Sequence, residues 1–483
     1  MPVPHPDAIA DCVLAAFHAL PAKCKPRKLA DGKREWAVLT GDRVDDTAPS
    51  CPPGYDTTSA STAAHYEPSS QHSPKRYEAP TLFCAALATG MKCLPQSKIP
   101  LAKGNVLHDW HAEVLAIRGF NMWLVDECQE LARRGMPTTR TEGEGENKKE
   151  GAWVGWRRRG AGRQGLDGHD GEQDSTACEQ DLKGTGESGS CSTQRQVRKP
   201  PFAVLDDVQI HMYCSEAPCG DASMELTMAE QEDATPWTQP PAEDSMLGRG
   251  NFDQLGVVRR KPARPDAPPT LSKSCSDKLA MKQCTSILSS VTSLLVRPDN
   301  AYLRTLVLPG TRCVHTAVER AFGREGRMNG VAWEELQGQW REAGYAFTPF
   351  EVMTTAREFE YSKNTTGDGS CSHLTEAPAP VPSNLSGLYT PKRLEVLVNG
   401  VLQGRKQNDP RGASCVSRRR MWEAACAVAE GFSMPAGLST FGSYEELKNS
   451  KMLAHREKVK LDVRRSALKG WKKNVGDEEW SLG

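Results

Sequence analysis

The spacing of apolar residues along the first hundred positions predicts one helix and two strands. Apolar side chains recur at helical intervals over residues 7–20, which predicts an amphipathic helix with one buried face. Short apolar runs at residues 36–39 and 82–88 have the length and composition of strands. The second strand leads directly into a glycine-containing loop, 89–93.

Helical spacing of apolar residues and short strand-like apolar runs continue to the end of the chain. Strands are expected at residues 202–205, 208–213 and 305–308. Helices are expected at residues 114–131, 278–295, 313–322, 333–343, 419–431 and 443–471. Strands that alternate with helices predict an α/β fold in which helices cover a mixed sheet.

Four polar segments interrupt this pattern. They span residues 45–79, 133–199, 230–246 and 362–382. All four are rich in Gly, Ser, Pro and charged residues and have almost no apolar periodicity. Such composition cannot bury enough apolar surface to fold by itself. We therefore predict a single domain over residues 1–483 that carries four disordered loops or insertions.

Composition narrows the class of protein. Hydrophobic residues make up 38% of the chain and its mean hydropathy is −0.56. No stretch approaches the roughly 18 apolar residues of a membrane span, and Asp7 and Asp11 interrupt the only candidate for a signal peptide. Sixteen irregularly spaced cysteines without a Cys-x-x-Cys pair do not form a disulfide framework. These features predict an intracellular protein of the cytoplasm or nucleus, with no obligatory protein partner evident.

Charge is balanced overall but segregated along the chain. The formal net charge is zero, which by itself argues against an RNA partner. Between residues 448 and 473, however, ten Lys or Arg face only two acidic residues. A second basic cluster begins at residue 259 and extends to residue 282. Local basic surfaces therefore keep RNA open as a partner.

Candidate chemistry lies in two short motifs about a hundred residues apart. His111-Ala112-Glu113 and Pro218-Cys219 form the front half of the zinc deaminase signature. In that chemistry His and Cys hold Zn²⁺, which lowers the pKa of a bound water, while the Glu is not a ligand but moves protons. The usual second cysteine, three positions after the first, is replaced by Ala222. A catalytic zinc needs three protein ligands, so the third must come from elsewhere.

Cys275 is the preferred third ligand. It precedes a helix-like run, as Cys219 does, and a helix N-terminus favours the thiolate that zinc requires. Cys214 and Cys284 are also near in sequence, but they lie in a strand-like run and in the middle of a helix, which is typical of buried thiols.

In this order, His111-Ala112-Glu113, Pro218-Cys219-Gly220-Asp221 and Ser274-Cys275-Ser276-Asp277 resemble the RNA adenosine deaminases. That family comprises enzymes that edit double-stranded RNA and enzymes that act on tRNA beside the anticodon. The loop 89–93 resembles the family's loop at the mouth of its pocket, and residues 259–270, 399–404 and 417–420 are most similar to the tRNA branch. The resemblance extends from about residue 12 to residue 471.

The resemblance implies a fold, a reaction and two cofactors. The fold is the cytidine-deaminase-like α/β sandwich with a C-terminal helical elaboration. The reaction is zinc-dependent hydrolytic deamination of adenosine to inosine at position 37 of alanine tRNA, with Glu113 as the proton-transfer group and Asp109 supporting the ligands. A buried inositol hexakisphosphate is implied as well. Its candidate ligands are Arg118, Lys278, Arg418, Tyr444, Lys448, Lys458 and Trp471.

Four positions depart from the family pattern around that cofactor. Ile117 and Met281 stand where relatives carry arginine, Lys282 where they carry tryptophan, and His108 where they carry asparagine. Some cations would then come from other positions, such as Lys282. Contacts to the RNA backbone or the flipped nucleotide are expected from Gly90, Lys92, Arg259, Arg260 and Lys261.

Two other functions remain open from the residues. One is deamination of structured mRNA, which would not require the tRNA body. The other is a non-catalytic RNA-binding subunit with a structural zinc, which would need a fourth Cys or His ligand. Retention of Glu113 argues against the second.

Overall fold

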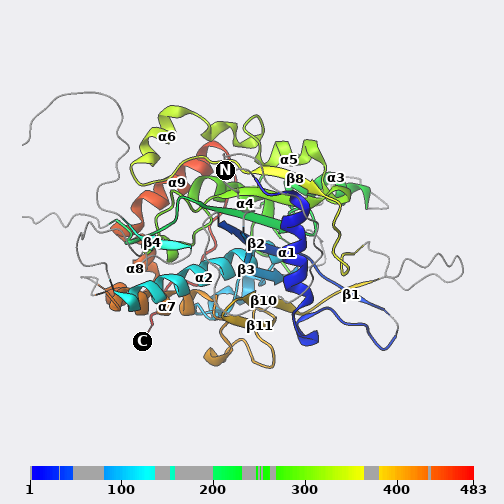
Figure 1. The fold of residues 1–483 in the computed structure, drawn as a ribbon, viewed down its shortest axis with the longest axis horizontal. Coiled ribbons are helices and arrows are strands. Elements are labelled where there is room, and N and C mark those ends of the chain that lie inside the picture. Colours follow the sequence, from blue (N-terminus) through cyan, green and yellow to red (C-terminus); the bar gives the residue numbers. More distant parts are fainter. Residues whose placement is uncertain are drawn as a thin grey trace, which may run out of the picture.

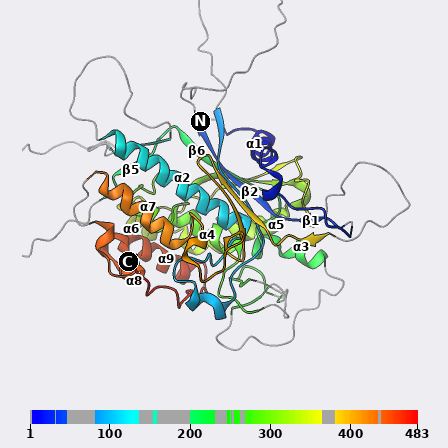
Figure 2. The ribbon, with the colours of Figure 1, turned by 90° about the horizontal axis from the view of Figure 1, so that it is seen from below.

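A computed structural model describes residues 3–31, 33–46, 81–135, 153–157, 199–230, 246–248, 251, 254–261, 268–363, 380–432 and 437–482. In these ranges the chain forms a mixed sheet with helices on both faces (Figures 1 and 2). Within the same ranges, no helix is both long and apolar enough to cross a membrane.

The helices are α1 (Pro6–His18), α2 (Ala112–Arg134), α3 (Met224–Ala229), α4 (Cys275–Thr285), α5 (His315–Phe322), α6 (Glu334–Arg341), α7 (Arg418–Glu430), α8 (Tyr444–Asn449) and α9 (Ala454–Ser466). The strands are β1 (Glu35–Trp36), β2 (Leu39–Asp46), β3 (Thr81–Thr89), β4 (Val154–Trp156), β5 (Phe202–Val204), β6 (Val208–Cys214), β7 (Leu303–Pro309), β8 (Glu351–Thr355), β9 (Val381–Pro382), β10 (Ser386–Thr390), β11 (Arg393–Val398) and β12 (Val401–Leu402).

The central sheet has the strand order β12-β11-β10-β3-β2-β6-β7-β8. The pairs β6–β7 and β7–β8 are parallel, and the other pairs of this sheet are antiparallel. The parallel strands all end at one edge, where the connecting loops are free to build a site. Two short pairs, β1–β9 and β4–β5, lie outside this sheet.

Alternation along the strands creates two cores. Leu87 and Tyr213 face α1, whereas their neighbours Ala86 and Met212 face the layer that contains α2 and α4. Helix α1 packs against β3, β2 and β6 on the first face, and α2 packs against β3, β2 and β10 on the other. In Figure 1, α7 lies beside α2, and α9 lies on the far side of α4 from the sheet.

The α/β fold predicted from the sequence is confirmed, and most element boundaries agree within a few residues. Two predicted helices are too long. The run 278–295 is helical only to Thr285, because Ser286 adopts a positive φ of 58° that ends α4. The run 443–471 divides into α8 and α9 around Ser450, whose backbone is extended.

The predicted insertions fall mainly outside the described residues, but Arg133 and Arg134 complete α2, and three further stretches form strands. Residues 154–156, expected to be disordered, form β4, which pairs with β5. Val381 and Pro382 form β9, and Asp45 and Asp46 continue β2. In each case the partner strand lies far away in sequence, so local composition gave no signal for pairing.

Candidate metal and catalytic site

Three potential metal ligands converge from three separate elements. His111 is the N-cap residue of α2, Cys275 is the first residue of α4, and Cys219 lies in the turn after β6. Their ligand atoms all lie within 4.8 Å of one another. The His111 Nδ1 atom is 3.9 Å from Cys219 Sγ, and the Cys275 N–H donates to Cys219 Sγ at 3.3 Å. The structure thus brings together the His/Cys/Cys set predicted from the sequence.

Hydrogen bonds fix the Cys219 turn against the start of α4. The Ser276 hydroxyl donates to the Pro218 carbonyl at 2.8 Å, and its backbone N–H donates to the Cys219 carbonyl at 3.0 Å. Gly220 has a φ of 106°, and a Cβ there would lie 2.3 Å from Ser274 Oγ. Only glycine allows this close approach, so the two cysteines are held in register by residues adjacent to them.

The pKa values of the two thiols are shifted in opposite directions. A hydrogen bond with Cys275, followed by the charges of Lys261 and His111, holds the pKa of Cys219 well below its usual value despite burial. Burial and the neighbouring thiolate raise the pKa of Cys275. The Lys261 ammonium donates to Cys275 Sγ at 3.0 Å. This cation compensates negative charge on the sulfur pair, which suits a site that must hold thiolates.

Glu113 lies in the first turn of α2, pointing at the same centre. Its Oε2 atom is 3.9 Å from His111 Nδ1 and, among the residues that the structure describes, has no hydrogen-bond partner. The side chain is 3% exposed, and burial raises its pKa. A buried carboxyl group with one unpaired oxygen beside a metal-ligand set is suited to proton transfer.

Asp109 connects this centre to a neighbouring cavity. Its Oδ1 accepts from the His111 N–H at 3.0 Å, and its Oδ2 accepts from Lys261 at 2.9 Å and from the Ser272 hydroxyl at 2.7 Å. Lys278 donates to the same oxygen. These cations hold the pKa of Asp109 well below its usual value although the group is buried. The predicted supporting role of Asp109 therefore has a direct geometric basis.

Beyond Lys278 lies a strongly basic cavity between α2, α4, α7 and α9. Its inner part has a volume of about 320 Å³ and its outer part about 250 Å³. Six of the seven predicted inositol phosphate ligands line one or both parts: Arg118, Lys278, Arg418, Tyr444, Lys448 and Trp471.

Lys458 is the exception and was assigned wrongly. Its side chain is 54% exposed and pairs with Asp462. On α9 a two-residue step turns the side chain by about 200°, so Arg456 and Lys460 face the cavity and Lys458 faces away. The four-residue spacing between Arg456 and Lys460 is a signal that sequence reasoning missed. Lys282, one turn after Lys278, also lines the cavity.

The five predicted RNA contacts separate into two groups. Lys92 and Arg260 are partly exposed, and Gly90 is buried within the loop 89–93. Arg259 and Lys261 are buried, with exposures of 0% and 3%. The Arg259 guanidinium donates to the carbonyls of Gly248 and Asn251 at 2.8 and 3.1 Å. A direct RNA contact is therefore wrong for these two residues, which stabilise the loop and the metal-ligand set instead.

Gly90 has a structural requirement of its own. Its φ is 153°, and a Cβ there would lie 2.2 Å from the Trp110 carbonyl oxygen. The Gly90 carbonyl accepts from the Ala112 N–H at 3.0 Å, next to the ligand His111. The loop therefore sits against the start of α2, and Lys92 within it pairs with Asn384.

Comparison with known proteins gives a consistent result. Residues 86–147 and 179–475 match the model of the adenosine-deaminase (editase) domain. Two curated proteins are similar, both named tRNA-specific adenosine deaminase 1. The Schizosaccharomyces pombe protein is 30% identical over 98% of this chain and 96% of its own length. The Saccharomyces cerevisiae protein is 26% identical over 63% of this chain and 58% of its own length.

Proposed function

This chain belongs to the adenosine-deaminase (editase) family and is a hydrolytic deaminase, and on that premise we propose that it converts adenosine to inosine in tRNA, at position 37 of alanine tRNA. The observation that carries the proposal is the near full-length similarity to a relative named for tRNA deamination. The position of Glu113 beside three potential ligands supports it. The resemblance of residues 259–270, 399–404 and 417–420 to the tRNA branch supports position 37.

His111, Cys219 and Cys275 would hold one zinc ion. One imidazole and two thiols match the donors that catalytic zinc prefers, and three ligands leave one coordination position for water or substrate. When bound, the ion would supply Lewis-acid activation of water near neutral pH. Among the residues that the structure describes, the ligand group has three members, which supports a catalytic rather than a structural ion.

Glu113 carries the proton chemistry in this proposal. Hydrolysis adds water at C6 of adenine and releases ammonia, so a proton must reach N1 and then the departing amine. Burial favours the protonated form of Glu113, and its unpaired Oε2 is free to accept and deliver that proton. His111 lies on one side of the carboxyl group, with its Nδ1 atom 3.9 Å from Oε2.

A highly anionic cofactor, inositol hexakisphosphate, would fit the basic cavity. Burial and neighbouring cations hold the pKa of Lys282 and Lys460 well below their usual values, and that of Arg118 at about 10. Burial is the larger cause, but the cations of the cavity also repel one another, and a bound anion would offset that repulsion. Glu457, between Lys448 and Lys460, supplies only part of the compensation.

The tRNA would approach from the side of the Gly90 loop. A base must leave its stack to reach a buried catalytic group, and an anticodon loop makes this inexpensive. Lys92 and Arg260 remain accessible enough to contact phosphates there.

The test is inosine formation at position 37 of an alanine tRNA transcript. Purified wild-type protein, with its zinc and phosphorus content measured, would be compared with Glu113→Gln. Inosine from the wild type alone supports the proposal. If a folded, zinc-containing wild-type protein forms inosine in a structured mRNA but in no tRNA, the substrate assignment is wrong. If it forms none in either RNA, the proposed reaction itself fails.

A further inference from the structure

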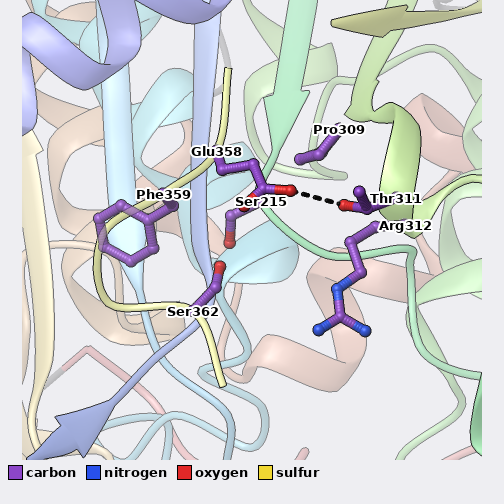
Figure 3. A pocket seen from close by; sticks show the side chains of 7 residues that line it. All are labelled: Ser215, Pro309, Thr311, Arg312, Glu358, Phe359 and Ser362. Carbon is purple, nitrogen blue, oxygen red and sulfur yellow. Dashed lines mark hydrogen bonds between the residues drawn. The ribbon is translucent and has the colours of Figure 1, made fainter. Parts of the chain in front are cut away.

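A second, smaller pocket is lined in part by Ser215, at the start of the loop that carries Cys219. It has a volume of about 230 Å³ and is shown in Figure 3. Its lining residues come from the ends of β6 and β7 and from the segment after β8: Ser215, Pro309, Thr311, Arg312, Glu358, Phe359 and Ser362. Ser215 begins the short loop that ends at Cys219, so the pocket is lined by a residue four positions before a candidate metal ligand.

The polar groups of this pocket are fixed in place. The Ser215 hydroxyl accepts from the Leu39 N–H at 2.9 Å, and Thr311 donates to Glu358 Oε1 at 2.9 Å. In Figure 3 the hydroxyls of Ser215 and Ser362 point toward each other across the pocket. Both serines are almost completely buried, at 1% and 6% exposure. The Ser362 hydroxyl also hydrogen-bonds Glu216, and buried hydroxyls that face a cavity offer their remaining donor or acceptor capacity to a ligand.

The charge of the pocket disfavours phosphate. The Arg312 guanidinium pairs with Glu216 at 3.2 Å and with Glu230 at 3.2 Å. Glu230 pairs in turn with Lys363 at 2.8 Å. Arg312 and Lys363 are therefore already engaged by carboxyl groups, and Glu358 adds an exposed carboxylate to the lining, which disfavours a phosphate group.

The size and chemistry instead suit one nucleobase. The volume is below the roughly 300–1,000 Å³ of sites for drug-sized ligands. The lining offers carboxylate acceptors on Glu358 and hydroxyl groups on Ser215 and Ser362. Phe359, whose ring is held edge-on against Phe17 at a centroid distance of 4.8 Å, forms a rigid wall. Proteins that read single-stranded RNA take up unstacked bases in this way.

We propose that this pocket binds the base immediately next to the edited adenosine, and that Glu358 favours a base with an exocyclic amine over uracil. A carboxylate accepts from the amine of cytosine, adenine or guanine, whereas uracil has no such donor. The inference rests on the proposed function, because it assumes an RNA substrate whose target base enters the neighbouring centre. It adds a second base-reading site to the catalytic one.

Two variants with matched controls test the proposal. Glu358→Gln removes the carboxylate, and Glu360→Gln makes the same change at an exposed residue two positions away. Thr311→Trp fills the pocket from an exposed position, and Thr316→Trp places the same side chain on exposed α5. All four proteins retain the proposed catalytic residues.

The first measurement is the rate of inosine formation in anticodon stem-loops that carry each of the four bases on either side of the target. We expect wild-type protein to discriminate about 5- to 100-fold against uracil at one flank. Glu358→Gln and Thr311→Trp should remove this discrimination, and the two controls should keep it. Equal rates for all four bases at both flanks with the wild type would overturn the proposal.

The second measurement does not depend on turnover. The Glu113→Gln protein is mixed with stem-loops that carry 2-aminopurine at either flanking position, because this base brightens when it leaves the stack. An increase at one flank that Thr311→Trp abolishes and Thr316→Trp preserves supports the pocket. No increase, or an increase that Thr311→Trp does not change, rejects it. Absence of inosine with every RNA would instead reject the proposed function, and the fluorescence would still report on the pocket.

Discussion

Lys261 donates a hydrogen bond to Cys275 Sγ at 3.0 Å from a fully buried position. The same ammonium group contacts Asp109 at 2.9 Å, so it joins a metal-ligand candidate to the carboxylate that positions His111. A lysine that sequence alone assigned to RNA binding is thus part of the structure that supports the proposed metal site. Partners of this kind orient ligands and tune their affinity.

Replacement of Lys261 should therefore weaken metal binding. We expect Lys261→Met to lower zinc affinity about 10- to 100-fold, because the thiolates lose their counter-charge and Asp109 loses a partner. Zinc content after dialysis against graded chelator, measured by atomic absorption, reports this directly. Lys98→Met, at an exposed position, is the matched control. Equal zinc retention by both variants and the wild type would show that Lys261 has no such role.

Glu113 should be essential for turnover but not for metal binding. Glu113→Gln keeps the shape of the side chain and removes its proton-transfer capacity, so we expect kcat to fall by about 10²- to 10⁴-fold with zinc content unchanged. Glu130→Gln changes a more exposed carboxylate on the same helix and should retain wild-type activity. Residual activity within a factor of three of wild type in Glu113→Gln would assign the proton transfer to another group.

The local sequence predicted what each element contributes, but not how distant elements pair. The ligand motifs and helix starts at His111, Cys219 and Cys275 are short-range features, and the structure brings them together as predicted. The burial of Lys261 depends on Asp109, 152 residues earlier in the chain. From the sequence alone, a basic residue on an exposed loop therefore cannot be told from a buried one whose acidic partner is distant in the chain. The same reason explains the pairing of β4 with β5.

Two lysines on α9 provide a direct test of the basic cavity. Lys460 is mostly covered, at 14% exposure, pairs with Glu457 and lines the cavity, whereas Lys458 is exposed and pairs with Asp462. We expect Lys460→Gln to co-purify with less inositol hexakisphosphate and to melt a few degrees lower than wild type. Lys458→Gln should match the wild type in both respects. Bound inositol phosphate is measured by mass spectrometry of the denatured protein.

The two variants change one charge by the same amount, so net charge cannot explain a difference between them. If Lys458→Gln loses as much bound inositol phosphate as Lys460→Gln, the helix face assigned here is wrong. If neither wild type nor variant carries any, and added inositol hexakisphosphate leaves all three melting temperatures unchanged, the cavity does not bind this cofactor.

Glu216 should make stability depend on pH. Burial raises its pKa to about 7, from an ordinary value of 4.5, with Arg312 only partly offsetting the effect. Since the folded state holds this proton more tightly than the unfolded state, its contribution is complete below about pH 4.5 and is lost as pH rises through 7. The loss amounts to at most about 3 kcal/mol if the whole shift is realised.

Glu216→Gln should therefore flatten the dependence of the unfolding free energy on pH across this window. Denaturant titrations between pH 5 and about 8 measure it, with Glu360→Gln as the exposed control. A Glu216→Gln profile that runs parallel to the wild type would mean that Arg312 keeps Glu216 ionised throughout, because the ion pair at 3.2 Å would then outweigh burial.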